Sequence, residues 1–183
     1  MKKLLLIAGP CAIEDKHMSM FIANHCKKLC EEFDIEYMFK GSYKKANRSR
    51  IDSFTGIGDD EALKILKEVG DELAVRTITD VHESYQCDLL KEVVDIIQIP
   101  AFLCRQTDLL LNASNTGKII NIKKGQFLAP WDMVNVVEKI KSTGNEKIIL
   151  TERGNSFGYN NLVFDLRSLI EMKKIGYPIV FDA

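Results

Sequence analysis

The sequence predicts an α/β protein in which helices cover a parallel sheet, and three observations support this prediction. Short β-rich runs alternate with stretches of helical spacing along all 183 residues. The runs are apolar on both faces, which is typical of strands buried in a parallel sheet. Polar residues gather where the runs end, at Lys40, Asp80, Gln98, Lys123 and Arg153. Since barrels carry their sites at the carboxyl ends of their strands, we expect a (β/α)8 TIM barrel.

Seven runs are expected to form strands. They are "KLLLIAG", "IEYMFKG", "AVRTITD", "VVDIIQIPAF", "KIINIKKG", "EKIILTERG" and "YPIVFDA", at residues 3–9, 35–41, 74–80, 93–102, 118–125, 146–154 and 177–183. Apolar residues three and four apart predict six helices, at residues 18–33, 59–69, 84–93, 106–116, 131–142 and 161–174. No linker or repeat interrupts the pattern. We therefore expect a single barrel domain over residues 1–183, covering about seven β/α units and lacking the C-terminal unit.

Charge and cysteine content exclude several classes of protein. Lys and Arg total 25 against 26 Asp and Glu, so no net charge favours nucleic acid or a membrane surface. Five irregularly spaced cysteines favour a reducing cytoplasm over a disulfide framework or a zinc finger. The apolar start is short and is interrupted by Gly9 and Pro10, so we expect neither a membrane span nor a signal peptide.

Cations follow three of the predicted strands. "FKGSYKKANRSR" contains Lys40, Lys44, Lys45, Arg48 and Arg50 beside Ser42, Asn47 and Ser49, "NIKKGQ" contains Lys123 and Lys124, and "LTERG" contains Glu152 and Arg153. Because the carboxyl ends of barrel strands meet on one face, these cations predict an anion pocket with room for more than one phosphate. The alternative is that each strand-end cation pairs with a neighbouring carboxylate.

Two further segments carry reactive side chains. "ITDVHE" places Asp80 and His82 after the third strand, and both residue types can transfer protons or bind a sugar hydroxyl. In "QIPAFLCRQTDLL", Gln98 and Arg105 flank an apolar turn, and we expect the Cys104 thiol there to be buried.

Six segments together resemble the family of 3-deoxy-D-manno-octulosonate 8-phosphate synthase, also called 2-dehydro-3-deoxyphosphooctonate aldolase. They are "IAGPCAIE", "FKGSYKKANRS", "TDVHE", "QIPAFLCRQTDLL", "KKGQFLAPWD" and "ERGNSFGYNNLVFDLRSL", and the resemblance runs from Leu5 to Ala183. It implies a transferase of lipopolysaccharide and carbohydrate biosynthesis. This enzyme condenses phosphoenolpyruvate with D-arabinose 5-phosphate and water, giving 3-deoxy-D-manno-octulosonate 8-phosphate and phosphate. The resemblance also implies a homo-oligomer, usually a tetramer.

The resemblance implies a role for each matching residue. The implied catalytic residues are Lys45, Asp80 and His82, and the implied substrate-binding residues are Lys40, Ser42, Asn47, Arg48, Ser49, Gln98, Arg105, Lys123 and Arg153. Lys123 and Arg153 would bind the phosphate of phosphoenolpyruvate. The carboxylate and reacting carbons would be surrounded by Lys40, Lys45 and Gln98. Arg48 and Ser49, near Asn47, would face the sugar phosphate, and Arg105 would reach the neighbouring subunit's pocket.

Cys11 follows Gly-Pro at the end of the first strand, where the sequence alone predicts a small buried thiol. The resemblance instead implies a metal-dependent enzyme with a divalent iron, zinc or manganese ion bound through Cys11. The other ligands, a His, a Glu and an Asp, are expected beyond Ala183. Thr55 and Lys44 depart from the residues usual in the family, and neither departure has an assigned effect.

Two alternatives stay open. The sister heptulosonate 7-phosphate synthase shares the barrel, phosphoenolpyruvate and the lysine and arginine pocket, but it takes erythrose 4-phosphate as its sugar. The other alternative is a truncated, inactive remnant that only binds phosphoenolpyruvate or other subunits. It is suggested by the missing eighth unit, because an open barrel leaves strand edges unpaired.

Overall fold

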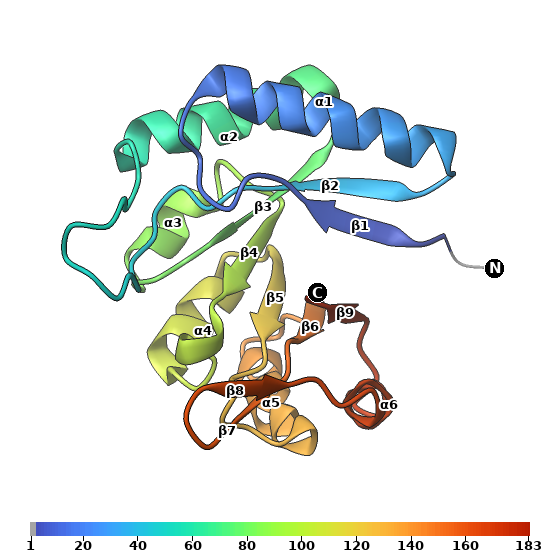
Figure 1. The fold of residues 1–183 in the computed structure, drawn as a ribbon. Coiled ribbons are helices and arrows are strands. Elements are labelled where there is room, and N and C mark those ends of the chain that lie inside the picture. The colour runs from blue at the N-terminus through green and yellow to red at the C-terminus, as the bar shows by residue number, and fades with distance from the viewer. Residues whose placement is uncertain (1–2) are drawn as a thin grey trace. The chain divides into compact units, whose positions relative to one another are not determined.

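The computed structural model describes residues 3–183, and these residues form two compact units (Figure 1). The first unit contains residues 3–80 and 92–96, and the second contains residues 81–91 and 97–183. Both units alternate strands with helices, which confirms the α/β pattern predicted from the sequence. The (β/α)8 count and the single-domain organisation stay predictions.

The strands that follow the predicted pattern are β1 (Leu5–Ala8), β2 (Glu36–Lys40), β3 (Arg76–Asp80), β4 (Ile96–Ile99), β5 (Ile119–Lys123), β6 (Ile148–Glu152) and β9 (Ile179–Phe181). The helices are α1 (Lys16–Glu32), α2 (Asp59–Leu73), α3 (Gln86–Leu90), α4 (Thr107–Asn115), α5 (Met133–Lys141) and α6 (Arg167–Lys173). Two short 3-10 helices, η1 (Ala101–Leu103) and η2 (Pro130–Asp132), follow β4 and precede α5. Among residues 3–183, no helix combines the length and apolar character needed to cross a bilayer.

The first unit orders its strands β1-β2-β3, and both pairings are parallel. Figure 1 shows α1 and α2 side by side over one face of these strands. α1 begins where the Asp15 carboxylate accepts a hydrogen bond from the Met18 amide at 2.7 Å, as a capping residue does. The apolar core of this unit includes Ala23, Met38, Phe39, Leu63, Leu66, Val69 and Ile78.

The chain leaving β1 is held against the chain leaving β2. A Cβ atom at Gly9 would lie 2.0 Å from the Lys40 carbonyl oxygen, so only glycine allows the two backbones to approach this closely. Beyond it, the Ile13 amide donates to the Ser42 carbonyl at 3.0 Å, and Ala12 pairs with Ser42 in a parallel bridge. The ends of both strands are therefore fixed where the predicted site residues begin.

The second unit orders its strands β4-β5-β6-β9. Lys123 of β5 stands opposite Thr151 of β6, and Glu152 of β6 stands opposite Phe181 of β9, both in parallel register. The apolar core of this unit includes Ile97, Ile99, Leu110, Ile120, Ile122, Val136, Val137, Ile140, Leu150 and Met172. It lies between the strands and the helices that follow them.

One predicted helix is partly wrong. Residues 161–163, expected to open the helix at 161–174, instead form β8 (Asn161–Val163), which pairs antiparallel with β7 (Asn155–Phe157). The turn between these strands places Gly158 and Asn160 at positive φ, which both residue types tolerate. The helix begins only after Asp165, whose carboxylate accepts the Arg167 amide at 2.9 Å. Local turn chemistry therefore overrides the helical spacing.

Candidate functional site

A buried polar cluster occupies the carboxyl ends of β2 and β3 in the first unit. Asp80, 8% exposed, accepts a hydrogen bond from Ser42 Oγ at 2.5 Å and lies 3.7 Å from Lys40 Nζ. Lys45 Nζ donates to Ser42 Oγ at 2.9 Å. The structure therefore brings together four of the residues predicted for the site. Ser42 links the Lys45 ammonium to the Asp80 carboxylate, an arrangement that can transmit a proton.

The other predicted site residues and cations of "FKGSYKKANRSR" make their contacts outside this cluster. Asn47, Arg48 and Ser49 lie on an exposed loop, where Arg48 Nε donates to the Phe54 carbonyl at 3.0 Å. The two other cations of the segment form ion pairs, Arg50 with Asp52 at 2.7 Å and Lys44 with Asp59 at 3.4 Å. The basic segment thus divides into two inward lysines and an outward, solvated loop.

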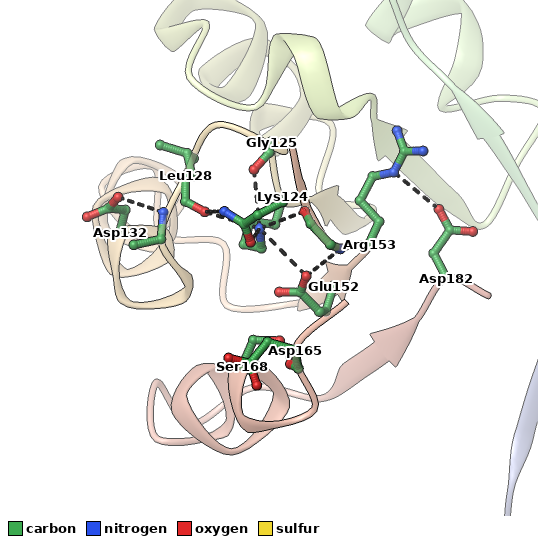
Figure 2. Close-up of polar contacts among 12 residues, drawn as sticks. Lys124, Gly125, Leu128, Asp132, Glu152, Arg153, Asp165, Ser168 and Asp182 are labelled. Carbon is green, nitrogen blue, oxygen red and sulfur yellow. Dashed lines mark hydrogen bonds and ion pairs between the residues drawn. The ribbon is translucent and has the colours of Figure 1, made fainter. Parts of the chain in front are cut away.

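In the second unit, two predicted phosphate ligands converge on one carboxylate oxygen. Lys123 Nζ lies 2.6 Å and Arg153 Nε lies 3.8 Å from Asp182 Oδ2. Figure 2 shows the Arg153 and Asp182 side chains pointing toward each other. The three side chains are only 18%, 30% and 35% exposed, and together they carry one net positive charge. The alternative stated for strand-end cations, pairing with a neighbouring carboxylate, therefore occurs at Asp182. The single carboxylate does not neutralise the two cations, Lys123 and Arg153.

A ladder of buried amide and hydroxyl groups adjoins this trio on β4, β5 and β6. Asn121 Nδ2 donates to Gln98 Oε1 at 2.8 Å, and Thr151 Oγ1 donates to Asn121 Oδ1 at 2.7 Å. Because side chains alternate along a strand, Asn121 shares a face with Lys123, and Thr151 shares a face with Arg153. Sequence reasoning did not single out Asn121 or Thr151, although their spacing of two residues from each cation was the available signal.

His82 and Arg105 line one polar groove of about 580 Å³ in the second unit. The loop carrying His82 is fixed by Gln86, whose Oε1 accepts the amides of His82 and Glu83, each at 3.0 Å. The Arg105 side chain is exposed, and its carbonyl accepts Lys139 Nζ at 3.2 Å. Of the three predicted catalytic residues, the structure thus links Lys45 with Asp80 and places His82 in this groove.

The prediction is wrong for Lys124, which is one of the cations expected in the anion pocket but does not lie with Lys123 and Arg153. Its ammonium is completely buried and lies 3.6 Å from Glu152 Oε1, which is also completely buried. Burial lowers the pKa of Lys124, and the nearby Glu152 carboxylate offsets part of this shift. The physical reason is again strand alternation, because Lys124 follows Lys123 and points to the opposite face of the sheet.

Cys11 is exposed, so the buried thiol predicted from the sequence alone is wrong, whereas Cys104 is buried as predicted. Within residues 3–183, no group of three or more His, Cys, Asp or Glu side chains could hold a metal ion. A single thiol does not fit a divalent cation, which takes about four or more ligands. The described residues therefore do not form the implied metal site, and the metal stays a prediction.

Alkylation is expected to modify Cys11 before the three buried cysteines, Cys30, Cys87 and Cys104. The thiolate is the reactive form, and burial raises the pKa of Cys30, Cys104 and, to about 11, Cys87. At about pH 8 these buried thiols remain protonated and covered, while Cys11 is accessible. Brief treatment with iodoacetamide followed by peptide mass spectrometry measures the order, and earlier labelling of Cys87 or Cys104 would contradict it.

Comparison with known proteins identifies relatives along the whole chain. The sequence profile of the DAHP synthetase I family matches residues 1–183. Proteins named 2-dehydro-3-deoxyphosphooctonate aldolase from Cyanothece sp., Fusobacterium nucleatum and Geotalea uraniireducens are 55%, 54% and 56% identical to it. The matches cover 97%, 99% and 100% of this chain, and 65%, 65% and 67% of those relatives. The chain thus spans about two thirds of their length.

Proposed function

We propose that this chain, which belongs to the DAHP synthetase I family, condenses phosphoenolpyruvate with D-arabinose 5-phosphate. The products are 3-deoxy-D-manno-octulosonate 8-phosphate and inorganic phosphate, so the protein is a transferase of lipopolysaccharide biosynthesis. The observation that carries the proposal is the convergence of Lys123 and Arg153 on a single carboxylate oxygen of Asp182. Two cations aimed at one oxygen atom, with one positive charge in excess, match the needs of a phosphate group. The names of the relatives support this substrate class.

The reaction forms one carbon–carbon bond and releases one phosphate. C3 of the enol attacks the aldehyde carbon of the sugar, and the aldehyde oxygen takes up a proton. Water adds at C2 and loses one proton, which balances the proton taken up by the aldehyde oxygen. The C2–O bond to phosphate then breaks, the remaining hydroxyl proton leaves with the phosphate, and a keto group remains at C2. Both substrates are polyanions, so much of the catalytic task is to hold them together against their mutual repulsion.

We assign the binding of the phosphoenolpyruvate phosphate to Lys123 and Arg153, whose positive charges favour the departing phosphate. Proton transfer is assigned to Lys45 and Asp80, which Ser42 joins through hydrogen bonds of 2.9 and 2.5 Å. In this linked group the ammonium can donate a proton while the carboxylate accepts one, as general acid and base catalysis requires. His82 is a third candidate for proton transfer.

The finer structural predictions belong to the same proposal. A complete (β/α)8 barrel is supported by the alternation of strands and helices and by polar residues at strand ends. A homotetramer in which Arg105 serves the neighbouring subunit is supported by the exposure of this side chain in its groove. A cytoplasmic location is supported by the five free cysteines. Asn47, Arg48 and Ser49, which lie on an exposed loop, are proposed to face the sugar phosphate.

The choice of sugar tests this function against the sister heptulosonate 7-phosphate synthase. Purified protein is supplied with phosphoenolpyruvate and either arabinose 5-phosphate or erythrose 4-phosphate, and released phosphate is measured. We expect release with arabinose 5-phosphate only. Release with erythrose 4-phosphate alone would assign the sister activity, and binding of phosphoenolpyruvate without release would assign the inactive remnant.

A further inference from the structure

We propose that Lys124 and Glu152 form a buried positioning pair that sets the spacing of Lys123 and Arg153, and through it the affinity for a phosphate group. The inference rests on the phosphate-binding function proposed above. It concerns two charged side chains that face away from the candidate site. Lys124 is one of the cations that the sequence predicts for the anion pocket, whereas the sequence predicts no role for Glu152. Each adjoins one of the two phosphate cations in the chain.

The register of β5 and β6 places this pair directly behind the cations. Lys123 stands opposite Thr151, and the Lys124 amide donates to the Thr151 carbonyl at 2.8 Å. Successive side chains point to opposite faces of a strand. Lys124 and Glu152 therefore meet on one face of the sheet, while their neighbours Lys123 and Arg153 meet Asp182 on the other.

The Lys124 ammonium joins three segments of the chain (Figure 2). It donates to the carbonyls of Leu128 and Gly154, each at 3.1 Å, to Asn155 Oδ1 at 2.9 Å and to the Gly125 carbonyl at 3.3 Å. Three N–H groups thus serve four neutral oxygen atoms, and the carboxylate atom Glu152 Oε1 is a fifth oxygen neighbour at 3.6 Å. The loop after β5 and the start of β7 are anchored on a single buried atom.

Glu152 fixes the peptide units on both sides of Arg153. Its Oε1 accepts the Gly154 amide at 2.6 Å, and its backbone carbonyl accepts the Asp182 amide at 3.0 Å. Gly154 has a φ of 88°, and a Cβ atom there would lie 2.9 Å from the Val163 carbonyl, so the turn that follows Arg153 requires glycine. The Glu152 side chain thereby constrains the peptide unit that follows Arg153. The bond to the Asp182 amide comes from the backbone and does not depend on the charged pair.

Burying the charges of Lys124 and Glu152 carries a large desolvation penalty, so the pair contributes little net stability to the fold. Both side chains are completely buried, and Glu152 Oε2 has no hydrogen-bond partner among residues 3–183. Apolar residues of similar volume commonly replace a buried ion pair without loss of stability. A charged pair that holds several carbonyls and lies next to both phosphate cations is instead suited to fixing their geometry.

The test separates positioning from stability. In the double variant Lys124→Met/Glu152→Gln no charge is left buried, so the protein is expected to fold. At a temperature where circular dichroism shows it folded, we expect its Kd for inorganic phosphate, measured by calorimetry, to rise about 10-fold. The Arg153 Nε–H group is also expected to lose order in ¹⁵N NMR relaxation.

Lys147→Met is the matched control, because Lys147 donates to the Gly117 carbonyl at 3.0 Å from an exposed position. The phosphate affinity and the order of Arg153 should both stay unchanged in this variant.

A folded double variant with wild-type Arg153 order and wild-type phosphate affinity would overturn the proposal. If the double variant does not fold, Glu152→Gln alone decides, because it keeps every carbonyl contact of Lys124. Here we expect a partial loss of Arg153 order, and unchanged order overturns the proposal. If the wild-type protein binds no phosphate, the proposed function fails, while Arg153 order still decides the role of the pair.

Discussion

Replacement of Lys124 by Met is expected to lower the free energy of unfolding by about 3–5 kcal/mol. The substitution leaves the Glu152 carboxylate buried without its counter-ion, and it removes the donor that serves the carbonyls of Gly125 and Gly154. Such uncompensated charges and unpaired carbonyls are among the few causes of large losses of stability. Urea unfolding followed by circular dichroism measures the change.

Two matched variants show whether the loss comes from the buried charge. Lys147→Met removes an exposed lysine that also contacts a backbone carbonyl, and it should change stability by less than about 0.5 kcal/mol. Adding Glu152→Gln to Lys124→Met removes the unpaired charge, and it should restore part of the lost stability. A loss below about 1 kcal/mol for Lys124→Met, or no recovery in the double variant, would contradict the importance of the pair.

Replacement of Arg153 or Lys123 by Ala is expected to weaken phosphate binding by about 1.5–3 kcal/mol in each case, or 10-fold to 100-fold in Kd. Each substitution removes a charge-assisted hydrogen-bond donor from a partly buried group whose net charge is one positive unit. Calorimetric titration with inorganic phosphate and with phosphoenolpyruvate measures the change. Binding should also weaken as the ionic strength rises, because salt screens such contacts.

Asp182→Asn supplies a control of opposite sign. The Asp182 carboxylate competes with phosphate for Lys123 and Arg153, so its neutralisation should tighten phosphate binding. Since Asp182 is about one third exposed, solvent screening limits the expected gain to about 1 kcal/mol, or a few-fold in Kd. Weaker binding in Asp182→Asn as well would show that the carboxylate orients the two cations and does not compete for them.

Much of the architecture followed from the sequence because its signals are local. The strands from β1 to β6, and β9, fall within the predicted β-rich runs. Strands of a parallel sheet are buried on both faces, so they appear in the sequence as short, nearly continuous apolar runs. The β7–β8 hairpin did not follow, because Leu162 and Val163 fit a helical spacing equally well. Its turn depends on positive φ values at Gly158 and Asn160, which a count of apolar residues does not detect.

The candidate site was only partly predictable, and its residue roles stay predictions. The positions of Lys40, Asp80, Lys123 and Arg153 at strand ends were evident from the chain, since alternating strands and helices define where each strand stops. Their partners were not evident. The hydrogen bond between Ser42 and Asp80 joins residues far apart in the sequence, as does the ion pair between Lys123 and Asp182.

The sequence by itself determined which residues stand at the strand ends, and strand alternation determined that Lys123 and Lys124 point to opposite faces. Only the tertiary structure decided which of these faces is buried. Lys124 became a buried anchor because β6 brings Glu152 beside it, and Lys123 became part of a cationic group because β9 brings Asp182 to it. The physical reason is that burial and charge pairing depend on neighbours that strand pairing supplies, and one strand does not specify which strand will lie beside it.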